Sequence, residues 1–268
     1  MPFDLGPALL FCPADRPERF DKAFERADAV ILDLEDAVAP DAKAAARANI
    51  LASSLNPERV IVRVNASGTD EFANDLETVT RSSYRTVMVA KTENADALDV
   101  FDESFSIIAL CETAKGVSNA NTIAAHPRVV AMMWGAEDLV ASMGGTSSRN
   151  PDGRYRDVAR FARAQVLLEA SAHEKAAIDA VHINIDDSHG LASEAADAAA
   201  SGFRATACIH PGQVSAIRAA YLPSAETLSW ARDVLAAAQG ERGVFRFRGQ
   251  MIDEPLLRHA RSVVARSS

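Results

Sequence analysis

The sequence predicts an α/β protein: a (β/α)8 barrel of the TIM type followed by a C-terminal helical extension. Eight short apolar runs alternate with charged, Ala-rich stretches of helical periodicity, which is the pattern of a closed parallel barrel. The length of 268 residues fits one large barrel domain, and 48% hydrophobic residues suffice for its core. An open doubly wound sheet stays an alternative, but no Gly-x-Gly-x-x-Gly motif follows the first run, so a dinucleotide site has no support.

The apolar runs come first, because strands buried on both faces read as continuous hydrophobic segments. The expected strands are Ala8–Pro13, Ala29–Leu34, Val60–Asn65, Thr86–Ala90, Ile107–Glu112, Val129–Gly135, Ala180–Ile185 and Thr206–Ile209. The expected helices are Pro17–Ala27, Asp41–Ser53, Glu71–Arg81, Asn94–Phe101, Val117–His126, Tyr155–His173, Ala192–Ser201 and Pro211–Ala220. Pro17 and Pro211 stand near helix starts, where the missing N–H of proline costs little.

Two further helical stretches follow the eighth unit. Ser224–Ala238 is amphipathic, and Glu254–Val264 comes after the polar link Gly240–Gln250, which is too short for a domain boundary but has room for a mobile flap. We therefore assign residues 1–222 to the barrel and residues 223–268 to the extension.

Composition excludes several classes of protein. The net charge of −9 argues against nucleic acid as a partner, although an acidic protein can still bind a phosphate-bearing cofactor locally. No apolar run approaches the length of a membrane span, and no signal peptide is evident, so we expect a cytoplasmic protein. Cys12, Cys111 and Cys208 form no CxxC pair and are interpreted as small buried hydrophobes of a reducing cytosol.

Two carboxylates stand where an expected strand gives way to small residues: Glu112 in Leu110-Cys111-Glu112-Thr113 and Asp138 in Gly135-Ala136-Glu137-Asp138. In a parallel α/β protein ligands bind at that edge. Magnesium usually takes one or two protein carboxylates and keeps open positions, so Glu112 and Asp138 are candidates to share one such ion. The alternative is that both acids only cap the helices that follow.

A charge inside an apolar run requires a partner, and Arg63 lies within Val60–Asn65. Asp33 and Glu35, at the end of the second expected strand, are its candidate ion-pair partners. Arg63 is also suited to hold a carboxylate or a developing enolate oxygen. We count Arg63, Asp33 and Glu35 among the candidate catalytic residues; the acids in Asp33–Asp36 are too close together for all to be buried and ionised.

Gly135, Ala136 and Glu137 open an expected helix, where backbone N–H groups hold small carboxylates well; an ordinary tight turn is the alternative. The following segment, Gly144–Arg149, either closes over the site or forms a surface loop.

Basic residues cluster after the first two expected strands, on loops that are neighbours in a closed barrel. They indicate a phosphate-bearing ligand, or else a solvated helix face. The candidates for cofactor binding are Arg16, Arg19, Lys22, Lys43 and Arg47, together with His210 at the last strand end. Asp253 precedes Glu254-Pro255 and by its chemistry alone is a helix N-cap.

Several of these segments, in this order, resemble the citrate lyase β-subunit-like proteins, relatives of malyl-CoA and citramalyl-CoA lyases. The resemblance covers essentially the whole chain. Its carriers are Leu10-Phe11-Cys12-Pro13-Ala14-Asp15-Arg16-Pro17, Ile31-Leu32-Asp33-Leu34-Glu35-Asp36-Ala37-Val38, Val62-Arg63-Val64-Asn65, Glu112-Thr113-Ala114-Lys115-Gly116, Trp134-Gly135-Ala136-Glu137-Asp138-Leu139, Ile209-His210-Pro211-Gly212-Gln213 and Gly249-Gln250-Met251-Ile252-Asp253.

The resemblance implies a barrel that assembles as a homotrimer or hexamer. It implies magnesium on Glu112 and Asp138, with Arg63 and Glu112 contacting the substrate and the Gly135–Asp138 backbone holding a keto-acid carboxylate. It also implies that Asp253 reaches a neighbouring subunit's site as an acid/base, a role added to that of an N-cap.

The implied activity is a Mg²⁺-dependent retro-Claisen cleavage, or the reverse condensation, of β-hydroxyacyl-CoA thioesters such as malyl-CoA or citramalyl-CoA. The partners are then a small acyl-CoA and a keto acid. Two alternatives stay open: a citryl-thioester lyase subunit acting on an acyl carrier protein, and a metal-dependent aldolase that releases pyruvate from free hydroxy-keto acids.

Overall fold

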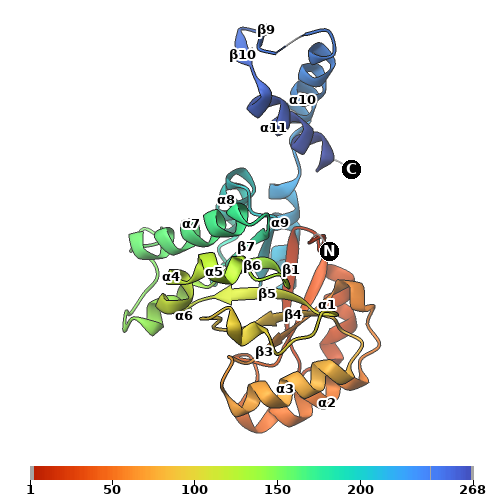
Figure 1. Cartoon of the computed structure of the whole chain (residues 1–268), viewed down its shortest axis with the longest axis vertical. Helices are drawn as coiled ribbons and strands as arrows, with labels where there is room; N and C mark the ends of the chain where they lie inside the picture. Colours follow the sequence, from red (N-terminus) through yellow and green to blue (C-terminus); the bar gives the residue numbers. More distant parts are fainter. Residues whose placement is uncertain (1–2, 242, 267–268) are drawn as a thin grey trace. The chain divides into compact units, whose positions relative to one another are not determined.

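The computed structural model describes residues 3–241 and 243–266 and contains a closed barrel of eight parallel strands in chain order, as the sequence predicts. Figure 1 shows the strands with helices arranged outside them. The strands are β1 Ala8–Pro13, β2 Ala29–Asp33, β3 Val60–Val64, β4 Thr86–Val89, β5 Ser106–Cys111, β6 Val129–Trp134, β7 Ala176–Asp179 and β8 Ala205–Cys208.

Helices and short turns of 3₁₀-helix connect the strands. The helices are α1 Phe20–Arg26, α2 Lys43–Ala52, α3 Asp70–Arg81, α4 Ala114–Ser118, α5 Ala120–Ala124, α6 Ala136–Ser142, α7 Asp157–Ala172, α8 Ser188–Ser201 and α9 Val214–Tyr221. The 3₁₀ turns are Pro17–Arg19, Pro40–Ala42, Pro57–Arg59, Asp96–Leu98 and Pro211–Gln213. No helix in the part of the chain that the structure describes is long and apolar enough to cross a membrane.

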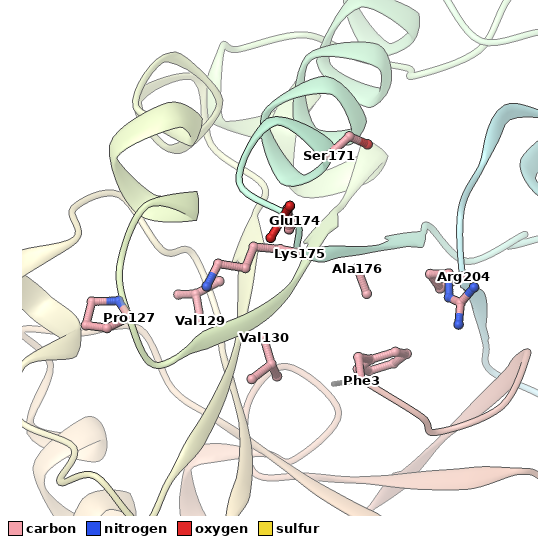
Figure 2. A pocket seen from close by; sticks show the side chains of 9 residues that line it. All are labelled: Phe3, Pro127, Val129, Val130, Ser171, Glu174, Lys175, Ala176 and Arg204. Carbon is pink, nitrogen blue, oxygen red and sulfur yellow. The ribbon is translucent and has the colours of Figure 1, made fainter. Parts of the chain in front are cut away.

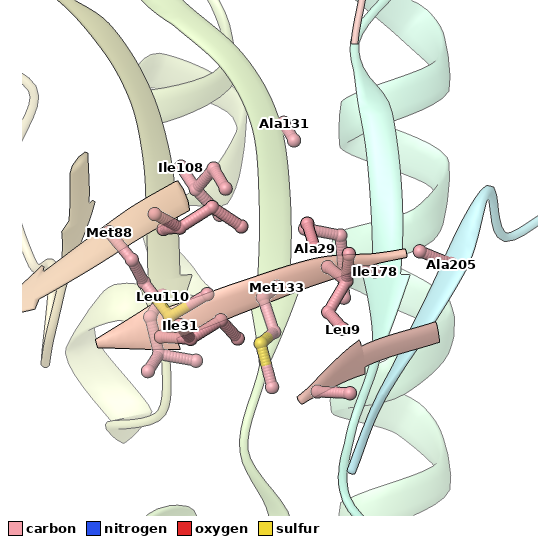
Figure 3. Close-up of a cluster of buried hydrophobic side chains, with 12 residues drawn as sticks. Leu9, Ala29, Ile31, Met88, Ile108, Leu110, Ala131, Met133, Ile178 and Ala205 are labelled. Atoms are coloured by element: carbon pink, nitrogen blue, oxygen red, sulfur yellow. The ribbon is translucent and has the colours of Figure 1, made fainter. Parts of the chain in front are cut away.

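Apolar side chains fill the inside of the barrel, and Figure 3 draws this cluster of buried residues. They are Leu9, Ala29, Ile31, Ile61, Met88, Ile108, Leu110, Ala131, Met133, Ile178, Ala205 and Ala207, all buried. Burying one Leu, Ile or Met side chain stabilises a fold by about 1.5–3 kcal/mol. This buried cluster therefore stabilises the closed barrel. Cys12, Cys111 and Cys208 are free thiols and buried, as expected.

Four elements differ from the expectation. The seventh strand is Ala176–Asp179 and not Ala180–Ile185; the β-branched run that suggested a strand is a loop in which Ile183 and Ile185 are half exposed. Only a single 3₁₀ turn forms within Asn94–Phe101. Val117–His126 is broken, because α4 ends at Ser118 and α5 begins at Ala120.

The fourth difference lies in the C-terminal region, where the link Gly240–Gln250 contains half of a β-hairpin. Strand β9 (Phe245–Phe247) pairs antiparallel with β10 (Gln250–Ile252), between α10 (Ala225–Ala238) and α11 (Glu254–Ala265). A separate small core of Ala231, Val234, Ile252, Ala260 and Val263 holds these four elements together. The alternation of apolar and charged residues over so few positions is too short a signal to predict the hairpin.

The chain divides into two compact units, one ending at Ile217 and the other beginning at Arg218. This division falls within α9, five residues before the boundary that we predicted from sequence at residue 222. The use of the second unit by a neighbouring subunit stays a prediction.

Candidate functional site

Strand register brings Arg63 to its acidic partners. Asp33 is the last residue of β2 and lies directly opposite Arg63 of β3. The guanidinium donates from Nε to Asp33 Oδ1 (2.7 Å) and from Nη2 to Asp33 Oδ2 (2.6 Å), and its Nη1 lies 3.0 Å from Glu35 Oε2. The predicted ion pair is therefore confirmed, with both acids. Arg63 also lies over the Phe11 ring, 4.8 Å from its centroid.

The register of β5 and β6 likewise places Glu112 beside the turn that leads to Asp138. Cys111 of β5 pairs with Trp134 of β6, so Glu112 and Gly135 follow adjacent strands at the same edge. Gly135 is required here, because a Cβ on it would lie only 2.7 Å from Glu112 Oε2. Asp138 follows in the first turn of α6.

The carboxylate of Glu112 carries a negative charge that its basic neighbours only partly balance. It is 3% exposed, and burial together with the neighbouring charge of Asp138 raises its pKa to about 8. Arg63 and Lys91 oppose this shift but do not cancel it. Burial also raises the pKa of Glu35, against the same two cations.

Lys91, two residues beyond the end of β4, is a member of this cluster that the sequence analysis missed. Its ammonium pairs with Glu35 and lies 3.0 Å from Asp36 Oδ2, 3.4 Å from Asp138 Oδ1 and 4.0 Å from Glu112 Oε1. Burial lowers the pKa of Lys91, but these carboxylates outweigh burial and raise it overall. A lone lysine directly after a buried strand was the only sequence signal.

The first turn of α6 is tied to the loop that follows the helix. The buried Ser148 donates its hydroxyl to Glu137 Oε1 (2.6 Å), and Arg149 forms an ion pair with Glu194 of α8. Arg149 also stacks over Tyr155 at 3.8 Å. The segment Gly144–Arg149 is thus anchored beside the site at its C-terminal end.

One small cavity of about 170 Å³ lies at the carboxyl edge of the strands, and several of the predicted site residues line it. Its polar wall contains Asp33, Arg63, Glu112 and Asp138 with Gly135, Ala136 and Glu137, and its apolar wall contains Phe11, Ala37, Leu110, Met133, Ala180, Val181 and Ile209. The structure thus brings together seven of the predicted site residues, with Glu35 joined to them through Arg63.

A wider cavity, of about 590 Å³, lies at the opposite end of the barrel (Figure 2). It opens beside the first residues of β6 and β7, between Phe3, Lys175 and Arg204. None of the predicted site acids lines it. Barrel enzymes place their chemistry at the carboxyl ends of the strands, so the smaller cavity is the candidate active site.

The basic residues predicted to bind a cofactor fall into two groups. Lys43 is buried, and its ammonium donates to the carbonyl oxygens of Leu34 and Glu35 and to Asn65 Oδ1 at 2.8–3.1 Å. Arg47 is committed to Glu71 (2.6 Å) and Asp75 (2.9 Å).

The other group lies at the surface. The acidic partners of Arg16 and Arg19 are their sequence neighbours Asp15 and Glu18, at 3.8 and 3.9 Å. Lys22 is exposed on α1. His210 is exposed and caps the turn Pro211–Gln213, where its Nδ1 accepts from the Gly212 N–H (3.1 Å).

Asp253 belongs to the second unit and is the N-cap of α11. Its Oδ1 accepts a hydrogen bond from the Leu256 N–H (3.2 Å), which confirms the capping interpretation. Its acid/base role in a neighbouring site stays a prediction.

Among residues 3–241 and 243–266, no group of three or more His, Cys, Asp or Glu side chains is arranged to hold a metal. A pair of carboxylates is nevertheless the usual protein contribution to a magnesium site, because that ion keeps several waters. Glu112 and Asp138 form such a pair.

Comparison with known proteins agrees with this geometry. The family model of HpcH/HpaI aldolase/citrate lyase matches residues 8–211. The chain is 55% identical over 262 residues to a citrate lyase subunit beta-like protein of Mycobacterium tuberculosis, covering 98% of this chain and 96% of that protein. It is 32% identical over 290 residues to the mitochondrial citramalyl-CoA lyase of Homo sapiens, covering 96% and 84%.

A solved structure is similar over nearly the whole chain. It is that of protein CitE from Mycobacterium tuberculosis in complex with magnesium, acetoacetate and coenzyme A. The TM-score is 0.93 at 54% sequence identity, with 98% of each chain covered.

Proposed function

Since this chain belongs to the HpcH/HpaI aldolase/citrate lyase family, we propose that it is a magnesium-dependent carbon–carbon lyase that acts on β-hydroxyacyl-CoA thioesters. Malyl-CoA and citramalyl-CoA are the substrates we put first. The observation that carries the proposal is the pair of Glu112 and Asp138 beside the paired Arg63 in one small cavity.

The residues present fit a magnesium ion. Glu112 is buried, faces the like charge of Asp138 and has a pKa raised to about 8, so a divalent cation would supply the charge that this pair lacks. Both are oxygen donors, as magnesium prefers. When bound, the ion would lower the pKa of a substrate hydroxyl as a Lewis acid.

In the proposed cleavage, the β-hydroxyl gives its proton to solvent, and its oxygen forms a carbonyl while the bond between the α and β carbons breaks. The electron pair moves into the thioester, which leaves as an enolate. Arg63, which Asp33 and Glu35 hold, is proposed to stabilise the enolate oxygen. Asp253 of a neighbouring subunit then supplies a proton to the enolate carbon.

The charged groups of the ligand suggest which residues bind its keto-acid carboxylate and its phosphates. The backbone of Gly135, Ala136 and Glu137 is proposed to hold the keto-acid carboxylate. The surface residues Arg16, Arg19 and Lys22 are proposed to contact the phosphates of coenzyme A, because Lys43 and Arg47 already donate to acceptors within the protein. The assembly is proposed to be a homotrimer or hexamer.

The test is an activity screen of the purified full chain with Mg²⁺ against malyl-, citramalyl-, citryl- and hydroxymethylglutaryl-CoA. Cleavage of at least one thioester is expected, with release of a keto acid and loss of activity in a chelator. The matched free acids and free hydroxy-keto acids are assayed in parallel. Turnover of free acids alone would favour the pyruvate-releasing aldolase, and turnover only with an acyl carrier protein would favour the citrate lyase subunit.

A further inference from the structure

Lys91 has an unusual backbone conformation that links it to the candidate metal pair. Its φ of 48° lies in the left-handed region, which residues other than glycine seldom adopt unless their surroundings require it. Its N–H donates to Glu112 Oε1 at 3.1 Å. The backbone of Lys91 therefore fixes one oxygen of Glu112, while Oε2 of the same carboxylate faces Gly135.

The side chain of Lys91 reaches two groups of acids at once. It pairs with Glu35 and Asp36 of the loop after β2, and it lies within 4.0 Å of Glu112 and Asp138. Its shorter contacts are with the loop, so most of its charge is directed there. Four carboxylates thus lie within 4.0 Å of this one ammonium, and Arg63 is a second basic partner of Glu35.

We propose that Lys91 is a positioning residue that restricts the metal to two protein ligands: it holds Glu35 and Asp36 and leaves Glu112 and Asp138 for the ion. This inference rests on the proposed function, because it requires that the pair binds magnesium. A site limited to two carboxylates suits Mg²⁺, which keeps its waters, whereas Ca²⁺ takes six to eight oxygen ligands and gains from every added carboxylate. Lys91 would thus weaken binding of both ions and favour Mg²⁺ over Ca²⁺.

The test is isothermal titration calorimetry of the purified full chain with Mg²⁺ and with Ca²⁺. Lys91→Met removes the charge but keeps an unbranched side chain. Like lysine, methionine must adopt the positive φ of this position. Loss of a cation within about 4 Å of the ligands is expected to tighten Mg²⁺ binding at least about tenfold. Ca²⁺ binding is expected to tighten more, so that the preference for Mg²⁺ narrows. The proposal is overturned if neither ion binds more tightly, or if Ca²⁺ gains no more than Mg²⁺.

Two further variants separate the charge from other effects. Lys91→Arg restores the charge and is expected to return both affinities to within about threefold of the wild-type values. Lys115→Met removes a nearby charge that pairs instead with Glu93 (3.3 Å), and both affinities are expected to stay unchanged. Wild-type protein that binds no Mg²⁺ would refute the proposed function itself, whereas wild-type binding with an unaltered Lys91→Met variant would refute only this inference.

Discussion

Substitution of Gly135 by alanine tests whether close approach of the turn to Glu112 shapes the site. The added Cβ would lie 2.7 Å from Glu112 Oε2 and 2.9 Å from Glu112 Cβ, both well inside van der Waals contact. The carboxylate can rotate away, but its Cβ is fixed by β5, whose end is paired with β6 through Cys111 and Trp134. The backbone must therefore shift.

Overpacking of this kind costs typically about 1–3 kcal/mol of folding stability. We expect Gly135→Ala to lose that amount in urea unfolding. Because the carboxylate that moves is a proposed metal ligand, we also expect Mg²⁺ affinity to fall by about tenfold or more, the equivalent of 1.4 kcal/mol. Mg²⁺ affinity is measured by calorimetry on the folded variant.

Gly240→Ala is the matched control, because a Cβ there meets nothing within 4 Å. Its stability is expected to stay within about 0.5 kcal/mol of wild type. Wild-type stability together with wild-type Mg²⁺ affinity in Gly135→Ala would refute the reasoning, since the turn would then have room that the structure does not provide.

Three further predictions address the charges of the site. Asp33→Asn removes the bidentate partner of Arg63 and is expected to cost about 3 kcal/mol in urea unfolding, because the buried guanidinium then keeps only Glu35 as a compensating charge among the partners described above. Glu112 has a folded pKa raised to about 8, so the folded state binds more protons than the unfolded state from about pH 4.5 upward. Stability in a chelator should therefore fall as pH rises towards 8, and Glu112→Gln should remove most of that fall; a parallel pH profile in the variant would contradict the assignment. Finally, mixing inactive Asp253→Ala with inactive Arg63→Ala should restore part of the thioester cleavage, because some mixed sites receive both intact residues; no recovery after confirmed subunit exchange would place Asp253 outside its neighbour's site.

The fold was predictable because its signals are repeated. Each strand of the barrel is buried on both faces, so hydrophobic runs mark seven of the eight strands at nearly their observed positions. The seventh was misplaced because Val181, Ile183 and Ile185 look more strand-like than Ala176–Asp179. Pairing with the neighbouring strands β6 and β8 selects the shorter segment. Tertiary pairing overrides local preference at that point.

The candidate site was predictable to the extent that strand ends determine it. Carboxylates that directly follow strands must meet at one edge, and this places Glu112 near Asp138 and Asp33 near Arg63. Side chains that enter the site from loops carry no such signal. The anchoring of Glu137 by Ser148 depends on how the loop after α6 folds back, which no periodicity in the sequence encodes.

Lys43 and Lys91 show why the role of a basic residue was the hardest part to predict. Both follow buried strands, and both contact the acidic loop after β2. The acceptors of Lys43 are two backbone carbonyls and the amide oxygen of Asn65, which makes it a buried support of that loop. The acceptors of Lys91 are carboxylates, and one of them, Asp138, lines the cavity. A lysine that donates its hydrogen bonds to neutral oxygens satisfies backbone acceptors. A lysine shared among several carboxylates instead determines how much negative charge is left to bind a ligand. The chemistry of the acceptors, which only the three-dimensional structure reveals, therefore separates a scaffold lysine from a site lysine.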